Sequence, residues 1–227
     1  MTMHIINIPE ITDVPVLGTD KRFPVRRIYC VGRNYIEHIK EMGGDVRKPP
    51  FFFQKPTDCI VQDGSQVKYP TLTSDFQFEI ELVLAIGLGG NNIKVEDAAR
   101  HVLGTAVGID FTRRDLQIQA RDAGRPWEIG KSFDQSAPIG GIKLLEGELP
   151  VTGEISLEVN GVTKQRGDLE QLIWNCAEII SKLSEQYELQ PGDLIYTGTP
   201  AGVGPVVRGD HITGKVEGHP LLHIDIV

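Results

Sequence analysis

Short apolar runs that are rich in β-branched residues recur along the whole chain, and turn-forming glycine or proline separates most of them. Runs of this length and composition are typical of β-strands. The 25 glycines and 14 prolines exceed the usual share and supply the turns that many short strands require. The sequence therefore predicts an α+β fold that is predominantly β. The clearest predicted strands are residues 27–31, 51–53, 78–86, 105–111, 154–159, 193–197, 211–216 and 221–227.

One hairpin can be predicted from its turn. Residues 154–159 alternate polar and apolar side chains, meet Asn160-Gly161, and continue as an extended polar segment. Asn-Gly readily adopts the two positive φ angles of a tight hairpin turn. The two flanking segments should therefore pair as antiparallel strands.

Helical patterns are scarce. The best one covers residues 168–187, where Asp168 can cap a helix with one wide apolar face. Residues 95–102 and 112–121 predict two shorter helices. Residues 35–42 form a fourth, polar candidate, which the pairs Gly43-Gly44 and Pro49-Pro50 follow. It is either a surface connection or a moving lid.

Composition excludes several classes of protein. Of the 227 residues, 40% are hydrophobic and 24% charged, which indicates a globular protein, and the absence of any linker or repeat favours a single domain. No apolar stretch approaches the roughly 18–20 residues of a membrane span, and the first residues do not form a secretion signal. Three widely spaced cysteines fit neither a disulfide framework nor a zinc site, so we expect a soluble, cytoplasmic protein.

The charge balance limits the partners. Acidic residues number 31 and basic residues 23, a net charge of −8. This excess argues against an extended basic face for nucleic acid or for an anionic membrane, and leaves room for a local basic pocket.

Three acidic residues form a candidate cation site. Glu79 and Glu81 are two residues apart at the start of an apolar strand, so their side chains should share a face. Such a pair either binds a cation or lies on the solvated face of an edge strand. Asp110 ends another apolar strand and either joins them or caps the helix that follows. All three together would form an oxygen-only site suited to Mg²⁺ or Mn²⁺.

Other residues could act on a substrate near such a site. His38 and Glu41 are three residues apart on the candidate lid, where the carboxylate could raise the basicity of the imidazole, although such pairs are common on surfaces. Arg114, Gln117 and Lys131 could provide donors to an anionic substrate. Solvated surface charge is the alternative for these residues, and we expect it for Arg113.

Residues 196–204 end a strand in a glycine-rich loop. The loop lacks the Gly-Lys-Ser/Thr ending of a phosphate-binding loop, so a nucleotide site is not expected. Its backbone N–H groups and the hydroxyl of Thr199 could still bind a small carboxylate.

Six motifs, in this order, resemble those of the fumarylacetoacetate hydrolase family. They span residues 30–204 and lie at 30–41 (CVGRNYIEHIKE), 50–56 (PFFFQKP), 78–82 (FEIEL), 110–117 (DFTRRDLQ), 127–134 (WEIGKSFD) and 197–204 (TGTPAGVG).

This resemblance implies a mixed β-sheet roll with a few short helices, usually assembled as a homodimer. Residues 26–227 would form the single catalytic domain, with an N-terminal segment, residues 1–25, packed on it. The resemblance also implies Glu79, Glu81 and Asp110 as Mg²⁺ or Mn²⁺ ligands, and His38 with Glu41 as the pair that activates water on a lid.

Members of the family act on small oxo acids. The intact His38 and Glu41 pair favours hydrolysis of a C–C bond in a 2,4-dioxo acid, with Lys131, Arg114 and Gln117 stabilising negative oxygen and Thr199 holding a carboxylate. The stretch that has Gln54 before a lysine most resembles the branch of the family that cleaves fumarylpyruvate in aromatic degradation, and from this resemblance we expect Gln54 to bind substrate.

Several alternatives stay open at this point. Within the family they are oxaloacetate decarboxylation and the isomerisation or decarboxylation of a dienoate. From another class comes a non-catalytic module that binds a cation and an oxo acid. A dicarboxylate substrate would need a second cationic anchor, for which the sequence offers Arg33, Arg121 and Arg125 without ranking them.

Overall fold

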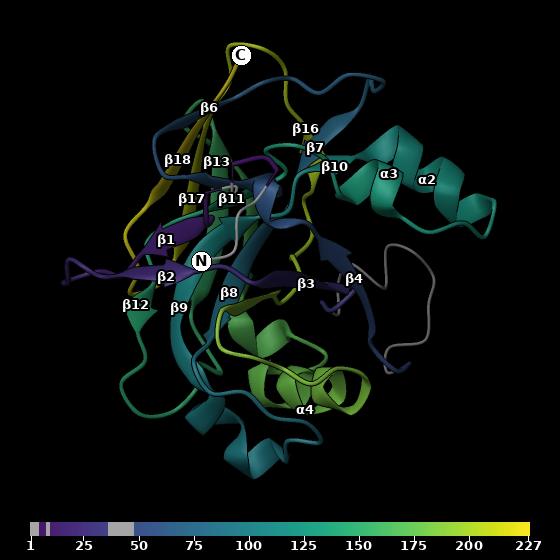
Figure 1. Cartoon of the computed structure of the whole chain (residues 1–227). Coiled ribbons are helices and arrows are strands. Elements are labelled where there is room, and N and C mark those ends of the chain that lie inside the picture. The colour runs from purple at the N-terminus through teal and green to yellow at the C-terminus, as the bar shows by residue number, and fades with distance from the viewer. Residues whose placement is uncertain (1–4, 8–9, 36–47) are drawn as a thin grey trace.

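The computed structural model describes residues 5–7, 10–35 and 48–227, and two large β-sheets pack against each other in it (Figure 1). The larger sheet has the strand order β4 (Phe51–Lys55), β3 (Arg27–Gly32), β15 (Asp193–Tyr196), β8 (Ile80–Ile86), β9 (Val102–Ile109), β11 (Ala137–Ile139) and β5 (Ile60–Gln62), with β12 (Lys143–Leu144) beside β9. The second sheet has the order β14 (Val162–Asp168), β13 (Glu154–Val159), β17 (His211–Val216), β18 (Leu222–Ile226) and β6 (Ser65–Val67).

In the part of the chain that the structure describes, two small sheets complete the β structure. They are the hairpin of β1 (Asp13–Pro15) and β2 (Arg22–Pro24), and a three-stranded sheet with the order β10 (Thr112–Arg113), β7 (Phe76–Phe78) and β16 (Gly204–Pro205). Most neighbours are antiparallel, but β15 pairs with β3, β11 with β5 and β18 with β6 in parallel. The expected mixed, predominantly β fold is confirmed.

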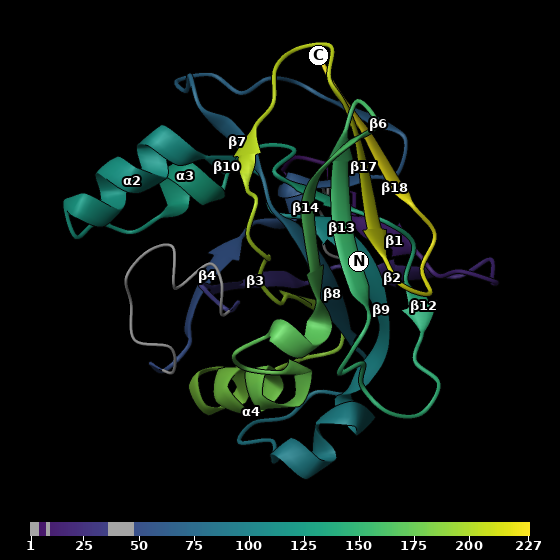
Figure 2. The same ribbon diagram turned by 180° about the vertical axis from the view of Figure 1, so that it is seen from behind.

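Among the described residues, helices are few and short. They are α2 (Arg114–Asp122), α3 (Glu128–Lys131) and α4 (Cys176–Gln186), with the 3₁₀ turns η1 (Thr57–Cys59), η2 (Val95–His101) and η3 (Leu169–Gln171). Figure 2 shows α4 across one end of the sheets, whereas α2 and α3 stand to one side, next to β7 and β10.

The main hydrophobic core lies between the two large sheets. Leu82 and Val107 project into it from the larger sheet, and Leu157 and Ile224 from the smaller one. Burying these branched side chains between two faces stabilises the stacked arrangement. A second cluster covers the opposite face of the larger sheet and includes Val14 and Phe23 from the first hairpin. The division of the chain into an N-terminal segment, residues 1–25, and a catalytic domain, residues 26–227, stays a prediction.

The predicted Asn160-Gly161 hairpin is confirmed. These two residues have φ angles of 52° and 75° and join β13 to β14 in antiparallel register. The predicted helix over residues 168–187 is wrong in its continuity, because η3 and α4 are separate. Each has its own capping box, with Asp168 at the start of η3 and Asn175 at the start of α4.

The predicted strand 78–86 is also divided. β7 ends at Phe78 and pairs with β10 and β16, whereas β8 begins at Ile80 and pairs with β9 and β15. Glu79 therefore lies where the chain passes from the three-stranded sheet to the larger one. The helix predicted to begin at residue 112 begins at Arg114, after the short strand β10.

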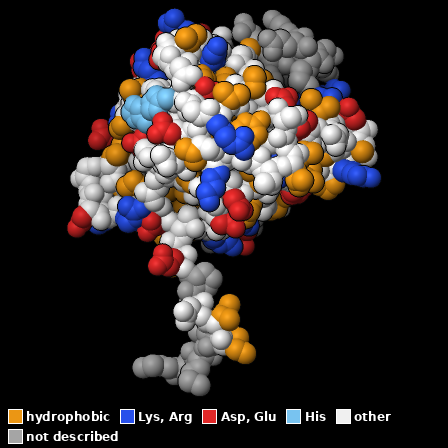
Figure 3. All heavy atoms as spheres, turned by 90° about the horizontal axis from the view of Figure 1, so that it is seen from above, with side chains coloured by type: hydrophobic (Ala, Val, Ile, Leu, Met, Phe, Trp, Pro, Cys, Tyr) orange, Lys and Arg blue, Asp and Glu red, His pale blue; other side chains and the backbone are white. Residues whose placement is uncertain are grey.

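The surface agrees with the mixed charge of the sequence. On the face shown in Figure 3, basic side chains of the described residues lie among acidic ones and form no continuous basic area. Within the described ranges, no helix has the length and apolar character needed to cross a membrane. The three cysteines are buried and unpaired, as expected.

Candidate active site

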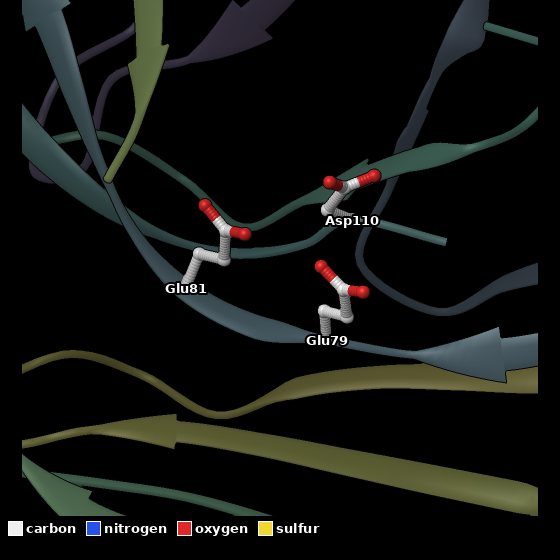
Figure 4. Close-up of side chains that lie close together, drawn as sticks. All are labelled: Glu79, Glu81 and Asp110. Carbon is white, nitrogen blue, oxygen red and sulfur yellow. The ribbon is translucent and has the colours of Figure 1, made fainter. Parts of the chain in front are cut away.

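The fold brings the three predicted acidic ligands together (Figure 4). Glu79 lies between β7 and β8, Glu81 lies in β8, and Asp110 directly follows β9. The backbone N–H of Asp110 donates to the carbonyl oxygen of Glu79 at 2.8 Å, which fixes the two segments side by side. The three residues are at most 7% exposed, and one oxygen from each carboxylate lies within 4.8 Å of the others.

Two buried lysines neutralise part of this charge. Lys131 Nζ, at the end of α3, donates to Glu79 Oε2 at 2.9 Å, Asp110 Oδ2 at 2.7 Å and Thr112 Oγ1 at 2.7 Å. Lys55 Nζ, at the end of β4, lies 2.9 Å from Asp110 Oδ1 as an ion pair. Asp110 is therefore held between two ammonium groups.

Helix α2 supplies the next residues of the site. Arg114 donates to Glu79 Oε1, to Gln77 Oε1 at 2.9 Å and to Gln117 Oε1 at 3.1 Å. Because Arg114 and Gln117 are three residues apart, they lie on the same face of the helix. Arg114 thus binds the metal-ligand candidate Glu79 and orients the amide of Gln117.

The glycine-rich loop after β15 meets the acidic cluster from the other side. The N–H of Gly198 donates to Glu81 Oε2 at 2.7 Å. The Thr199 hydroxyl accepts from Gln165 Nε2 at 2.8 Å, and Gln165 Oε1 accepts from the N–H of Ile80 at 2.9 Å. The loop is therefore tied both to β8 and to β14.

The surroundings of Glu79 and Glu81 shift the pKa values of the two side chains in opposite directions. Burial alone would raise the pKa of Glu79, but Lys131 and Arg114 outweigh it and hold that pKa well below its usual range. Burial raises the pKa of Glu81 well above its usual range, and the charges of Asp110 and Glu79 raise it further. Burial lowers the pKa of Lys131, but Asp110 and Glu79 more than compensate and raise it overall.

These residues fit a hard divalent cation. The donor set is three carboxylates, and oxygen ligands are those preferred by Mg²⁺ and Mn²⁺. Asp110 Oδ1 is buried and accepts no hydrogen bond from the described residues, although it is paired electrostatically with Lys55. Bringing three anionic groups together is costly without a cation, as the raised pKa of Glu81 reflects.

A cavity of about 390 Å³ opens above the acidic cluster. It brings together most of the residues predicted for the site, and Arg33 and Arg121 line it as well. Arg125 is exposed and is not among the residues that line it. The predicted site residues that line the cavity are Glu79, Glu81, Asp110, Arg114, Gln117, Lys131 and Thr199.

The structure places Gln54 apart from the other predicted site residues. Side chains alternate along β4, so that Phe53 lines the cavity and Lys55 reaches Asp110. Gln54 is offset by one residue and lines a separate depression beside Trp127 and Tyr187. The structure does not bring its side chain to the site.

Two further interpretations are wrong. Asp110 does not cap the following helix, because α2 begins at Arg114 and has no side-chain cap. Arg113 is not a freely solvated charge, since its guanidinium carbon lies 4.3 Å from the centroid of the Phe133 ring. Burial lowers the pKa of Arg113, which agrees with its half-buried position.

Sequence reasoning missed two buried residues that organise the site. Lys55 follows the inward-facing Phe53 at a spacing of two, and this alternation could have indicated its direction. Gln165 lies in a strand whose other side chains are mostly exposed, and nothing in the sequence marks it as buried. The predicted water-activating pair, His38 and Glu41, lies outside the described residues, and its role stays a prediction.

The fold and this site define an enzyme class, and comparison with known proteins agrees. Residues 27–227 match the family described as fumarylacetoacetate (FAA) hydrolase C-terminal. The chain belongs to the fumarylacetoacetate hydrolase family. The expectation of an enzyme in the class of C–C bond hydrolases that act on ketonic substances is thereby confirmed.

Individual relatives and one solved structure show which enzymes the chain is similar to. The chain is 51% identical to the fumarylpyruvate hydrolase of a Ralstonia species over 168 residues, which is 74% of this chain and 88% of that protein. It is 37% identical to the oxaloacetate tautomerase YcgM of Escherichia coli K12 over 202 residues, 88% of this chain and 92% of that one. The crystal structure of fumarylpyruvate hydrolase from Pseudomonas aeruginosa in complex with Mn²⁺ and pyruvate matches with a TM-score of 0.96 and 49% identity, covering 99% of both chains.

Proposed function

We propose that this protein hydrolyses fumarylpyruvate, a 2,4-dioxo acid, to fumarate and pyruvate, with Mg²⁺ or Mn²⁺ bound by Glu79, Glu81 and Asp110. The observation that carries the proposal is the buried carboxylate triad at the base of the cavity, in a chain 51% identical to a fumarylpyruvate hydrolase. The Mn²⁺ and pyruvate in the Pseudomonas relative support the same assignment.

The reaction divides a carbon chain between C3 and C4. The oxygen of water bonds to the C4 carbonyl carbon, the C3–C4 bond breaks, and its electron pair passes to C3 as the enolate of pyruvate. A proton then returns to C3, and fumarate leaves from the other side. A bound divalent cation would supply positive charge to the carboxylate and 2-oxo oxygens, where the enolate charge develops.

Residues of this chain would bind and orient the dioxo acid. Thr199 and Gln117 offer a hydroxyl and an amide to oxygens of the substrate. Lys131 adds positive charge at the base of the cavity, but its three protons already have acceptors in Glu79, Asp110 and Thr112. We therefore assign Lys131 first to holding the carboxylates in place. Deprotonation of the attacking water is assigned to His38, assisted by Glu41.

The competing function is enol–keto interconversion of oxaloacetate, which the 37% identity to the E. coli tautomerase favours. Steady-state assays with Mn²⁺ separate the two. We expect loss of the fumarylpyruvate enol absorbance with equal release of pyruvate and fumarate. A specificity constant higher for oxaloacetate by orders of magnitude, without cleavage of fumarylpyruvate, would refute the hydrolase.

A further inference from the structure

One face of helix α2 lines the cavity along the length of the helix. Arg114, Gln117, Ile118 and Arg121 all line it, at the spacing of one helical face. Arg114 lies at the acidic end, where it contacts Glu79. Arg121 is seven positions further along the helix, which places it about 10 Å further along the axis.

The wall of the cavity contains apolar side chains as well. Phe53, Ile118, Trp127 and Val203 line it together with the polar residues. A cavity with an acidic, cation-binding base, apolar wall residues and a separate arginine suits an elongated ligand with polar groups at both ends and a hydrocarbon segment between them.

The three arginines that line the cavity are not equivalent. Arg114 is occupied by Glu79, Gln77 and Gln117. Arg33 follows β3 directly, in the left-handed region with φ of 58°, whereas Arg121 belongs to the same helical face as Arg114 and is displaced from it along the helix. The contact of Arg121 is from Nε to the exposed neighbour Asp122 at 2.8 Å, and such exposed pairs contribute little. The guanidinium fork of Arg121 is thus the better placed to bind a carboxylate at a distance from the acidic triad.

We propose that Arg121 is the specificity-determining residue that binds the far carboxylate of a dicarboxylic oxo acid, so that the site selects a two-ended diacid over a 2-oxo acid with an uncharged tail. This inference rests on the proposed function for the position of the substrate head at the acidic triad. The two carboxylates of fumarylpyruvate stand at opposite ends of one extended seven-carbon chain, a span comparable with two helical turns, or about 10 Å.

The first experiment measures binding without turnover. The probes are 2-oxoheptanedioate and 2-oxoheptanoate, which share head and chain length, differ in the far carboxylate, and lack the C4 carbonyl at which water would attack. In the presence of Mn²⁺ and about 0.15 M salt, where exposed charges are already screened, the wild-type protein should bind the diacid about 10–100-fold more tightly. Arg121→Gln should reduce this ratio to less than threefold.

Arg125→Gln is the matched control. Arg125 is four residues further along the chain, is exposed and does not line the cavity, so its replacement removes the same net charge from the same region. This variant should keep the wild-type preference for the diacid. Arg121→Lys should retain part of it, and circular dichroism should show unchanged helix content in all variants.

The second experiment compares cleavage of fumarylpyruvate with cleavage of acetylpyruvate, which has the same head and no far carboxylate. Arg121→Gln should lower kcat/KM for both substrates, and the fold-loss should be at least ten times larger for fumarylpyruvate than for acetylpyruvate. The difference should arise mainly from a higher KM for fumarylpyruvate. Equal losses on both substrates, a wild-type protein without preference for the diacid, or a loss of preference in Arg125→Gln would overturn the assignment of Arg121. A wild-type protein that cleaves neither substrate but prefers the diacid would refute the hydrolase and leave the Arg121 site standing.

Discussion

The ammonium of Lys55 and the carboxylate of Asp110 form an ion pair of 2.9 Å that is almost completely excluded from solvent. Lys55 also donates to the carbonyl oxygens of Phe111 and Lys131 and to the hydroxyl of Ser136. One buried charge therefore ties the segment that follows β9, which carries Asp110, to the end of α3, which carries Lys131. This arrangement holds two site residues in a fixed relation before any ligand binds.

Lys55→Met tests this role. The substitution keeps most of the aliphatic volume but removes the donor of three hydrogen bonds and the ion-pair partner of one carboxylate. Breaking a buried pair typically costs about 3–5 kcal/mol. We expect the free energy of unfolding, measured by urea denaturation, to fall by that amount. Lys68→Met, at an exposed position, is the control and should change it by less than about 0.5 kcal/mol. Equal effects of the two variants would contradict the structural role of Lys55.

Glu81→Gln separates cation binding from folding. The amide has the shape of the protonated carboxyl that the raised pKa of Glu81 favours, so the variant should fold. Loss of one ligand charge should lower Mn²⁺ affinity on the order of 100-fold or more, and activity should fall with it. Calorimetric titration with Mn²⁺ measures the affinity. Glu146→Gln, an exposed acidic position, should bind Mn²⁺ like the wild type. Unchanged affinity in Glu81→Gln would remove this residue from the ligand set.

The carboxyl group of Glu81 also determines how the stability of the cation-free protein depends on pH. Because burial, Asp110 and Glu79 raise the pKa of Glu81 above the ordinary value of 4.5, the folded state keeps a proton that the unfolded state has lost. The folded state therefore binds more protons in this window, and this contribution to stability falls as pH rises above about 4.5.

Melting temperatures in EDTA between about pH 5 and 8 test the sign of this effect. The wild type should lose stability relative to Glu81→Gln as pH rises, because the glutamine cannot ionise. With saturating Mn²⁺ this pH dependence should disappear for the wild type, since cation binding displaces the proton and neither the folded nor the unfolded state then carries one at Glu81. Parallel pH curves for the two proteins in EDTA would contradict a raised pKa at Glu81.

Much of the fold could be predicted because its signals are local. Apolar β-branched runs predicted the main strands, and the Asn160-Gly161 turn predicted the antiparallel hairpin of β13 and β14. The division of residues 168–187 into η3 and α4 was harder, because the apolar face continues across the gap while Asn175 starts a second helix. A continuous hydrophobic pattern does not exclude a break when a second cap is available within it.

The candidate site was predictable where alternation along one strand decides the direction of a side chain. Glu79 and Glu81 were expected on one face, and they meet Asp110 even though the strand is interrupted at Glu79. Alternation could have given the direction of Lys55 but not its partner, and it gives neither for Gln165, because their roles depend on contacts 55 and 85 residues away, with Asp110 and Ile80. Such partners are defined by tertiary structure.

Gly198→Ala tests the loop that holds Glu81. Gly198 has a φ of 104°, and an added Cβ would lie 2.8 Å from Asn34 Cβ, a buried side chain fixed by hydrogen bonds to Trp174 and Thr197. Alanine must therefore displace the N–H that binds Glu81 Oε2.

Gly161→Ala is the matched control, because Gly161 also has a positive φ, of 75°, but nothing lies within 4 Å of an added Cβ. Both variants should lose about 1–3 kcal/mol from backbone strain, with the larger loss in Gly198→Ala. Mn²⁺ affinity, measured by calorimetry, should fall only in Gly198→Ala, and an equal change in both variants would show that the Gly198 contact does not position Glu81.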